Sequence, residues 1–322
     1  MAAALAMAGL AAILLAPPAT ARPSPAPPAA RIIDMHMHAY ARDERWTARI
    51  GNPVTGQAMV ATDEAAHRAA TFAAMKRTHI VKAVVSSDDY DAVLRWKQAA
   101  PDQVFVSYGF DDPAKVDLDF LRKEKAAGRL DAIGEVGSQY EGIAPNDPRL
   151  EHLYALAEEL DLPFGLHLHP GPPGATSIGY PKIRPSLGDP LLLEDVLARH
   201  PRLRLYIMHA GWPFLEHMNA LLNAYPQVYV DVAVIDWTRP RKEFHGYLRG
   251  LVEAGYGKRV MFGSDQMVWP EAIDMSVAAI QSADYLTAEQ KGDIFFHNAA
   301  RFLRLEPVTP VAPRGAMETL PR

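Results

Sequence analysis

The chain has 322 residues, of which 49% are hydrophobic and 22% are charged, and its formal net charge is −5 at pH 7. This composition supplies a sizeable core, and a chain of this length is typical of one large α/β domain. The negative charge gives no electrostatic footprint for nucleic acid or for an anionic membrane. Because the chain has no cysteine, disulfides, thiolate metal sites and a cysteine nucleophile are excluded.

Both ends of the chain are predicted to lie outside the fold. Residues 2–16 are almost entirely Ala, Leu, Met and Ile, and a small-x-small pattern ends at Ala21. We expect an export signal over residues 1–21, cut after Ala21, and a periplasmic or secreted protein. The stretch is too short for a stable membrane span of ~20 residues. No Lys or Arg precedes the apolar run, so a misassigned start or an apolar tail is the alternative. Residues 22–30 are predicted to form a proline-rich spacer, and residues 306–322 an irregular tail.

Strand-like and helix-like segments alternate over residues 31–305. Most strand candidates are near-continuous apolar runs, as expected of parallel strands covered on both faces. The strands are predicted over 31–38, 82–87, 103–110, 131–137, 163–169, 203–209, 227–234 and 259–265. The helices are predicted over 62–78, 89–100, 114–126, 149–160, 190–199, 215–225, 241–254, 270–283 and 288–304. Eight strand-then-helix units predict an α/β fold, a single (β/α)8 TIM barrel with an extra C-terminal helix.

Histidines gather at the downstream ends of the apolar runs. Five of the twelve follow this rule, namely His36, His38, His167, His169 and His209. A further run, RVMFGSD, ends in Asp265. Since the carboxyl ends of barrel strands meet at one mouth, these side chains predict a divalent metal site there. Two buried, hydrogen-bonded histidines would be the alternative for any one pair.

The remaining ligand assignments follow from position within each run. Side chains alternate along a strand, so His167 and His169 share a face, and we favour His167 as the ligand because it lies closer to the body of the strand. His169 would then contact a ligand or the substrate. Glu135, on the fourth strand, could bind or bridge metal ions, or form a structural salt bridge. Asp265 could instead cap the next helix, but Pro270 places the start of that helix several residues later.

Aromatic and basic residues near the predicted mouth are candidates for substrate binding. Trp212, Trp237 and Trp269 follow strands six, seven and eight and would wall an apolar or aromatic pocket, although core packing explains them equally well. The basic residues that could hold a substrate carboxylate are Lys182, Arg184, Arg239 and Arg241. A solvated surface position is the alternative for each of them.

The ordered set of HxH on strand one, His on strands five and six and Asp on strand eight resembles the amidohydrolase superfamily. The similarity is greatest to its amidohydrolase-related branch, which also holds lactone hydrolases and nonoxidative decarboxylases, and it includes the stretches IGEVGSQYEG, HAGWP and MFGSDQMVWPEA. The resemblance implies that His36, His38, His167 and Asp265 bind metal and that His209 binds a second ion or orients the substrate. Many members carry a carboxylated lysine at the position of Glu135, whereas TatD-like hydrolases carry a glutamate there. Both a site with one ion and a site with two ions are therefore compatible with the sequence.

These observations predict a metal-dependent hydrolase that cleaves a C–O or C–N bond of a lactone, ester or amide. The cation, for which zinc is expected, would lower the pKa of bound water from ~16 toward ~7. Asp265 would accept the water proton, and His209 or the metal would stabilise the oxyanion. The alternatives are nonoxidative decarboxylation of an aromatic or enoic acid, and a noncatalytic exported metal- or ligand-binding protein. We expect a small-molecule substrate and no nucleic-acid partner, and a homo-oligomer is compatible with the sequence.

Overall fold

Eight parallel strands form one sheet in which each strand pairs with the next along the chain. The computed structural model describes residues 31–41 and 49–305, so the predicted export signal, spacer and tail lie outside the described residues. The strands are β1 (Ile32–His38), β2 (Ile80–Ser87), β3 (Val104–Phe110), β4 (Ala132–Val136), β5 (Phe164–His167), β6 (Leu205–Met208), β7 (Tyr229–Asp231) and β8 (Val260–Met261). The segment after β8 returns to β1, because Met35 N donates to Phe262 O at 2.9 Å and Asp265 N donates to His36 O at 2.8 Å. The ring is thereby closed.

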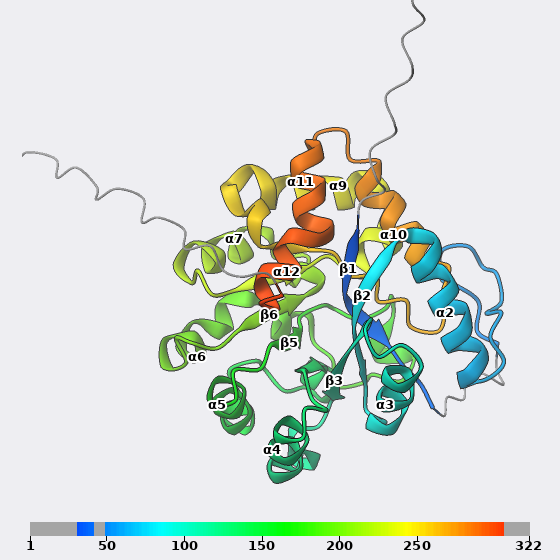
Figure 1. Cartoon of the computed structure of the whole chain (residues 1–322). Coiled ribbons are helices and arrows are strands. Elements are labelled where there is room, and N and C mark those ends of the chain that lie inside the picture. Colours follow the sequence, from blue (N-terminus) through cyan, green and yellow to red (C-terminus); the bar gives the residue numbers. More distant parts are fainter. Residues whose placement is uncertain (1–30, 42–48, 306–322) are drawn as a thin grey trace, which may run out of the picture.

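Helices follow the strands and surround the sheet (Figure 1). They are α2 (Glu64–Thr78), α3 (Tyr90–Ala99), α4 (Leu118–Ala126), α5 (Glu151–Glu159), α6 (Glu194–Arg199), α7 (Leu215–Ala224), α8 (Ile235–Thr238), α9 (Arg241–Leu251), α10 (Ala272–Gln281), α11 (Ala288–Gly292) and α12 (Asn298–Phe302). This alternation confirms the predicted (β/α)8 barrel. Within the described residues, no helix is long and apolar enough to cross a membrane.

The last two strands are shorter than the sequence predicted. The runs at 227–234 and 259–265 remain apolar, but β7 ends at Asp231 and β8 at Met261. Asp231 Oδ1 accepts hydrogen bonds from the backbone N–H groups of His209 and Ala233, each at 3.0 Å, and this turns the chain out of the sheet. Val234 then has a φ of 60°, and the short helix α8, which was not predicted, begins at Ile235.

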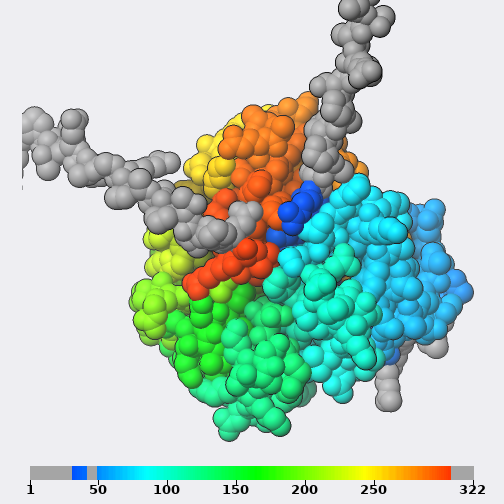
Figure 2. All heavy atoms as spheres, in the orientation of Figure 1, coloured from blue at the N-terminus to red at the C-terminus, as the bar shows by residue number. Residues whose placement is uncertain are grey.

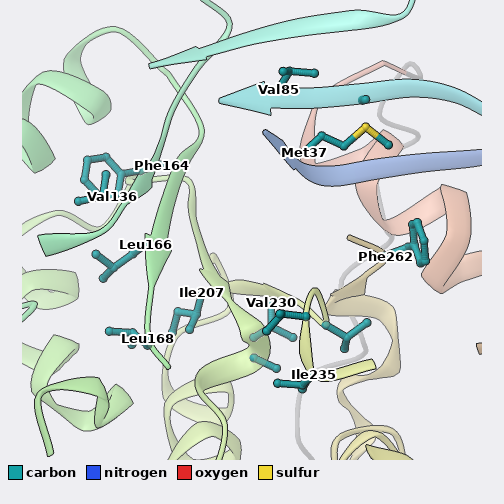
Figure 3. Packing of buried hydrophobic residues seen from close by; sticks show 14 of the residues in the cluster. Met37, Val85, Val136, Phe164, Leu166, Leu168, Ile207, Val230, Ile235 and Phe262 are labelled. Atoms are coloured by element: carbon teal, nitrogen blue, oxygen red, sulfur yellow. The ribbon is translucent and has the colours of Figure 1, made fainter. Parts of the chain in front are cut away.

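Two clusters of buried apolar side chains pack against the sheet of the barrel. Between sheet and helices lies a large apolar cluster, part of which, including Phe164, Leu166 and Ile207, is drawn in Figure 3. A second cluster joins Met35 of β1 and Tyr206 of β6 to Phe302 of α12. Tyr206 needs a glycine beside it, because a Cβ on Gly165 would lie 2.5 Å from its ring.

The extra C-terminal helix completes this second cluster. A capping box between Thr287 and Gln290 begins this helix. The predicted segment 288–304 forms α11, a π-helical turn over Asp293–His297, and α12. The Phe302 ring lies 5.5 Å from that of Tyr206 and 4.9 Å from that of Tyr229, near the amino ends of β6 and β7. Figure 2 shows the red residues of α12 beside the blue start of β1. This helix therefore covers the end of the barrel opposite the mouth.

Candidate metal centre and substrate cavity

Six side chains from five strands or their immediate extensions meet at the carboxyl ends of the strands. His38 and His167 are the last residues of β1 and β5, and His209 follows β6 directly. Among the described residues, three overlapping groups have donor atoms within 4.8 Å of one another, and together they contain His36, His38, Glu135, His167, His209 and Asp265. The structure thus brings together every residue that the sequence predicted to bind metal.

The two histidines of β1 lie close to each other and to the carboxylates of Glu135 and Asp265. His36 Nε2 lies 3.2 Å from His38 Nε2 and 3.4 Å from Glu135 Oε2. His38 Nε2 lies 3.2 Å from Glu135 Oε2 and 3.1 Å from Asp265 Oδ1. His36 Nε2 lies 4.0 Å from Asp265 Oδ1. Ligands held at about 2.1 Å in a tetrahedron are roughly 3.4 Å apart, so this spacing fits a zinc-sized cation.

A second donor set shares Glu135. His209 Nε2 lies 3.0 Å from His167 Nδ1 and 3.5 Å from Glu135 Oε1, and Oε1 also contacts His167 Nδ1. Glu135 therefore presents Oε2 to the first set and Oε1 to the second. A carboxylate in this position can bridge two cations, which gives the site room for either one ion or two.

A carboxylate or carbonyl lies behind three of the imidazoles at the other ring nitrogen, and a hydroxyl lies behind the fourth, His38. His36 Nδ1 lies 3.4 Å from Asp231 Oδ2, and His38 Nδ1 lies 3.4 Å from Ser86 Oγ. His167 Nε2 contacts the His169 carbonyl at 3.3 Å, and His209 Nδ1 contacts the Ala233 carbonyl at 3.0 Å. A carbonyl or carboxylate behind the ring places the proton on that nitrogen and leaves the other lone pair facing the centre. This is the tautomer that binds metal.

The electrostatics of the centre favour a positive charge. Burial lowers the pKa of His38, but its contacts with Asp265 and Glu135 outweigh burial and raise the pKa to about 10. Burial raises the pKa of Asp265, yet the neighbouring His36 and His38 bring it below its ordinary value. The pKa of Glu135 is likewise well below its usual range, because His167 and His36 outweigh its burial. A divalent cation at this point would supply the positive charge that these carboxylates stabilise.

Two carboxylates that the sequence analysis passed over support the ligands. Asp231, at the end of β7, is fully buried and contacts His36. Asp34 Oδ1 accepts hydrogen bonds from the backbone N–H groups of His36 and Ser264, each at 3.0 Å, and so joins β1 to the segment after β8. The signal for both was an acid inside an apolar run, whereas Asp265 was identified as an acid that ends such a run.

Asp265 and His209 occupy backbone conformations that their neighbours enforce. Their φ angles are 46° and 59°, in the left-handed region that non-glycine residues seldom adopt. Asp265 N donates to His36 O, and His209 N donates to Asp231 Oδ1. The following helix α10 has Glu271 as its N-cap, so the alternative role of Asp265 as a helix cap does not apply.

A cavity of about 480 Å³ opens from this centre, and His167, His209 and Asp265 lie in its wall. Trp269 also lines it, and its Nε1 donates to Ile50 O at 3.1 Å. The sequence analysis missed Tyr140, a lining residue whose ring centre lies 4.6 Å from that of His167.

Two of the other predicted substrate-binding residues, His169 and Arg239, line the same cavity. Burial, followed by the charges of His209 and His167, holds the pKa of His169 well below its usual value, so this ring is neutral. Trp212 is half-buried beside them, with its ring centre 5.4 Å from that of His169.

The remaining predicted residues lie elsewhere. Trp237 is buried, is not among the lining residues, and donates from Nε1 to Ser264 O at 2.8 Å. Arg184 is exposed and donates to the carbonyls of Pro181 and Ile183. Of the other basic candidates, Lys182 pairs with Glu141 at 2.5 Å and Arg241 donates to Asp236 O at 3.0 Å.

Solved structures with the same fold include enzymes of two reaction types. A probable 2-pyrone-4,6-dicarboxylic acid hydrolase from Acinetobacter baumannii matches at 16% identity and a TM-score of 0.58. A 5-carboxyvanillate decarboxylase from Sphingomonas paucimobilis matches at 15% identity and a TM-score of 0.56. An amidohydrolase from Burkholderia multivorans with bound zinc matches at 18% identity and a TM-score of 0.58. Each match covers 85% of this chain and 99% of the other. At such identities the similarity shows the fold.

Sequence comparison identifies the family. Protein fluG of Emericella nidulans is 26% identical over 153 residues, which cover 42% of this chain and 18% of that protein. The chain therefore spans less than a fifth of the length of this relative. The model of the amidohydrolase family matches residues 33–305, which run from the second residue of β1 to the end of the described barrel and include all six side chains of the centre. The chain belongs to the amidohydrolase family.

Proposed function

We propose that this protein is a metal-dependent hydrolase that cleaves a C–O or C–N bond in a small organic molecule. The observation that carries the proposal is the pair of donor sets joined by Glu135, three of whose members, His167, His209 and Asp265, line the mouth cavity. Zinc is the cation that we assign to it, because nitrogen and oxygen donors at near-tetrahedral spacing suit zinc. A cation held there would polarise a substrate carbonyl or lower the pKa of a water molecule toward neutrality.

Asp265 and His209 have different roles beside the cation. Asp265 lies both in the donor set and in the cavity wall, so its carboxylate can accept the proton of the attacking water and return it to the leaving group. His209 donates through Nδ1 to Ala233 O, so its Nε2 presents a lone pair to the centre. A ring in this tautomer has no N–H for an oxyanion, and we therefore assign His209 to metal binding rather than to oxyanion stabilisation.

One observation favours a second candidate, nonoxidative decarboxylation on the same centre. A decarboxylase needs a positively charged side chain to bind the carboxylate that leaves as carbon dioxide. Arg239 lies in the cavity wall and forms no ion pair with any acid of the described residues. The two reactions differ in what they do with water. Hydrolysis incorporates one water oxygen into the product, whereas decarboxylation releases carbon dioxide and takes up only a proton.

The test is a substrate screen with the zinc-loaded full chain. Lactones, esters, amides and aromatic acids would be assayed in water enriched in oxygen-18, and products analysed by mass spectrometry. We expect one heavy oxygen in the product. Carbon dioxide release without heavy oxygen would refute the hydrolase in favour of the lyase, and turnover by metal-stripped protein would refute both.

Asp265→Asn tests the role of the base. Assayed at saturating zinc, it should keep the fold and lose turnover by roughly 10²–10⁴-fold, the usual contribution of a general base. The matched control is Asp236→Asn, which changes another buried acid that lies outside the donor set and the cavity wall. Asp265→Asn with wild-type turnover would remove Asp265 from the mechanism.

A further inference from the structure

The exposed apolar side chains of the described residues gather around the opening of the mouth cavity. Six large hydrophobic side chains are exposed, and five of them lie in the loops that follow β1 and β5, namely Ile50, Val54, Val60, Ile178 and Tyr180. All of these except Val60 line the cavity that contains three members of the donor sets, and we call these four the apolar rim. Exposed apolar side chains that lie together on a folded domain mark a binding site.

One side of the apolar rim is an ordered hairpin. Gly51 and Ala58 form an antiparallel bridge, and the buried Asn52 holds the turn between them. Asn52 Oδ1 accepts a hydrogen bond from the backbone N–H of Val54 at 2.9 Å, and Asn52 Nδ2 donates to Glu271 Oε1 at 3.1 Å. The turn is thereby tied to the residue that precedes α10. Val54 is therefore exposed at a position that the fold fixes.

The other side of the apolar rim is joined to the metal centre by a row of rings. The Tyr140 ring centre lies 4.6 Å from that of His167 and 4.8 Å from that of Tyr180. His167 is buried, Tyr140 is half-buried and Tyr180 is 39% exposed, so this wall runs from the centre to the surface. Ile178 lies in the same turn as Tyr180, since both backbone N–H groups donate to Ala175 O, at 3.2 and 3.0 Å.

Charge and size limit what the apolar rim can bind. Among the described residues, the exposed ones that line the cavity carry no charge, because they are three prolines and the four side chains of the apolar rim. Deeper in the cavity the wall continues with Val234, Met267 and Trp269. The volume of about 480 Å³ lies within the range of roughly 300–1,000 Å³ that is usual for pockets of small organic ligands.

We propose that the apolar rim binds an alkyl or aryl group of the substrate, so that the protein selects substrates whose apolar group extends from the bond that reacts to the surface. Such a group removes the exposed side chains of the rim from water, and the resulting gain in affinity grows with the apolar area that is covered. This inference rests on the proposed function for the bond that is cleaved, but binding of the apolar group is measured without turnover.

The test uses straight-chain hydroxamates of two, four, six and eight carbons as probes of the zinc-loaded full chain, with calorimetry as the readout. The hydroxamate group binds zinc, so every probe starts from the same anchor and differs only in the length of its alkyl chain. Affinity should rise about threefold to fourfold for each methylene that the cavity wall or the rim covers. Val54→Ser and Ile178→Ser should each weaken binding of the eight-carbon probe by roughly threefold to tenfold and leave that of the two-carbon probe unchanged.

Val60→Ser is the matched control, because Val60 lies in the same loop as Val54 and is 76% exposed but does not line the cavity. It should bind every probe as the wild type does. Zinc content and size-exclusion chromatography show whether the centre and the oligomeric state of each variant are those of the wild type.

Affinity that does not rise with chain length, or wild-type affinity of the Val54 and Ile178 variants for the eight-carbon probe, would overturn the inference. A change of oligomeric state in these two variants without a loss of chain-length dependence would assign the apolar rim to contact with a second copy of the chain instead. Each of these results leaves the hydrolase proposal to its own screen. Failure of that screen leaves the dependence of binding on chain length standing.

Discussion

Asp231→Asn should impair metal binding without impairing the fold. Asp231 Oδ1 accepts two backbone N–H groups, those of His209 and Ala233, each at 3.0 Å, while Oδ2 lies 3.4 Å from His36 Nδ1. In the asparagine, only the amide oxygen can accept, so it must remain on the two backbone groups. The NH2 group then faces His36 Nδ1 and donates to it. The His36 proton moves to Nε2, which is the nitrogen that faces the centre, and this tautomer cannot bind metal.

The magnitude follows from the position of Asp231 behind a ligand. Loss of such a partner typically weakens metal binding by about 10–100-fold, which corresponds to ~1.4–2.7 kcal/mol. The assay is competition for zinc between the full chain and a chromophoric chelator at pH 7.5. The thermal midpoint of the metal-free protein should change little, because both backbone hydrogen bonds of Asp231 are retained.

Asp236→Asn is the control, since Asp236 is equally buried, lies five residues downstream, and bonds Ser276 rather than a ligand. It should bind zinc as the wild type does. Zinc affinity of Asp231→Asn within twofold of the wild-type value would refute the tautomer argument. Equal losses in the Asp231 and Asp236 variants would assign the effect to general damage of the core.

Three further predictions concern the core, the pH and the metal. Trp237→Phe should lower the free energy of unfolding, measured by denaturant titration, by about 1–3 kcal/mol, because it leaves the Ser264 carbonyl without its donor. Its KM should remain that of the wild type. Trp269→Phe, in the cavity wall, should instead change KM. Burial raises the pKa of Asp236 in the folded protein well above its ordinary value. Since the unfolded chain ionises at the ordinary value, the wild type loses stability as the pH rises above that value, by at most ~1.4 kcal/mol per pH unit. Asp236→Asn lacks this loss, so its stability relative to the wild type in denaturant titrations should increase from pH 5 to pH 7, and a constant difference would contradict the assigned pKa. Removal of zinc by a chelator should abolish turnover and lower the thermal midpoint, and zinc at 100 times its dissociation constant should restore about 2.7 kcal/mol of stability. Unchanged stability would contradict a metal bound at the mouth of the barrel.

The sequence predicted the ligand set because strand ends are visible in it. An apolar run that stops at a histidine or an aspartate marks a strand whose carboxyl end carries a polar side chain, and barrel closure brings such ends together. His36 and Asp265 are 229 positions apart, yet the backbone of Asp265 bonds that of His36. The same rule does not identify Asp231, because the run YVDVAV continues beyond it and the sequence predicts one strand over 227–234.

The direction of side chains in the mouth loops could not be predicted in the same way. Trp237 and Trp269 both follow a strand and looked equivalent, but the Nε1 of Trp237 bonds Ser264 O and that of Trp269 bonds Ile50 O. Arg184 and Arg239 both lie near the mouth, and only Arg239 reaches the cavity. In each case the outcome depends on contacts with distant segments, which periodicity and local propensity do not contain.

The most direct test of the account is the position of the metal in crystals of the zinc-loaded protein, measured by anomalous scattering at the zinc edge. We expect a peak about 2.0–2.2 Å from His36 Nε2, His38 Nε2 and Asp265. A second peak, if two ions bind, should lie between His167 Nδ1 and His209 Nε2 on the other side of Glu135. Zinc-loaded crystals without a peak among these six side chains, or with the ordered zinc elsewhere on the molecule, would contradict the account.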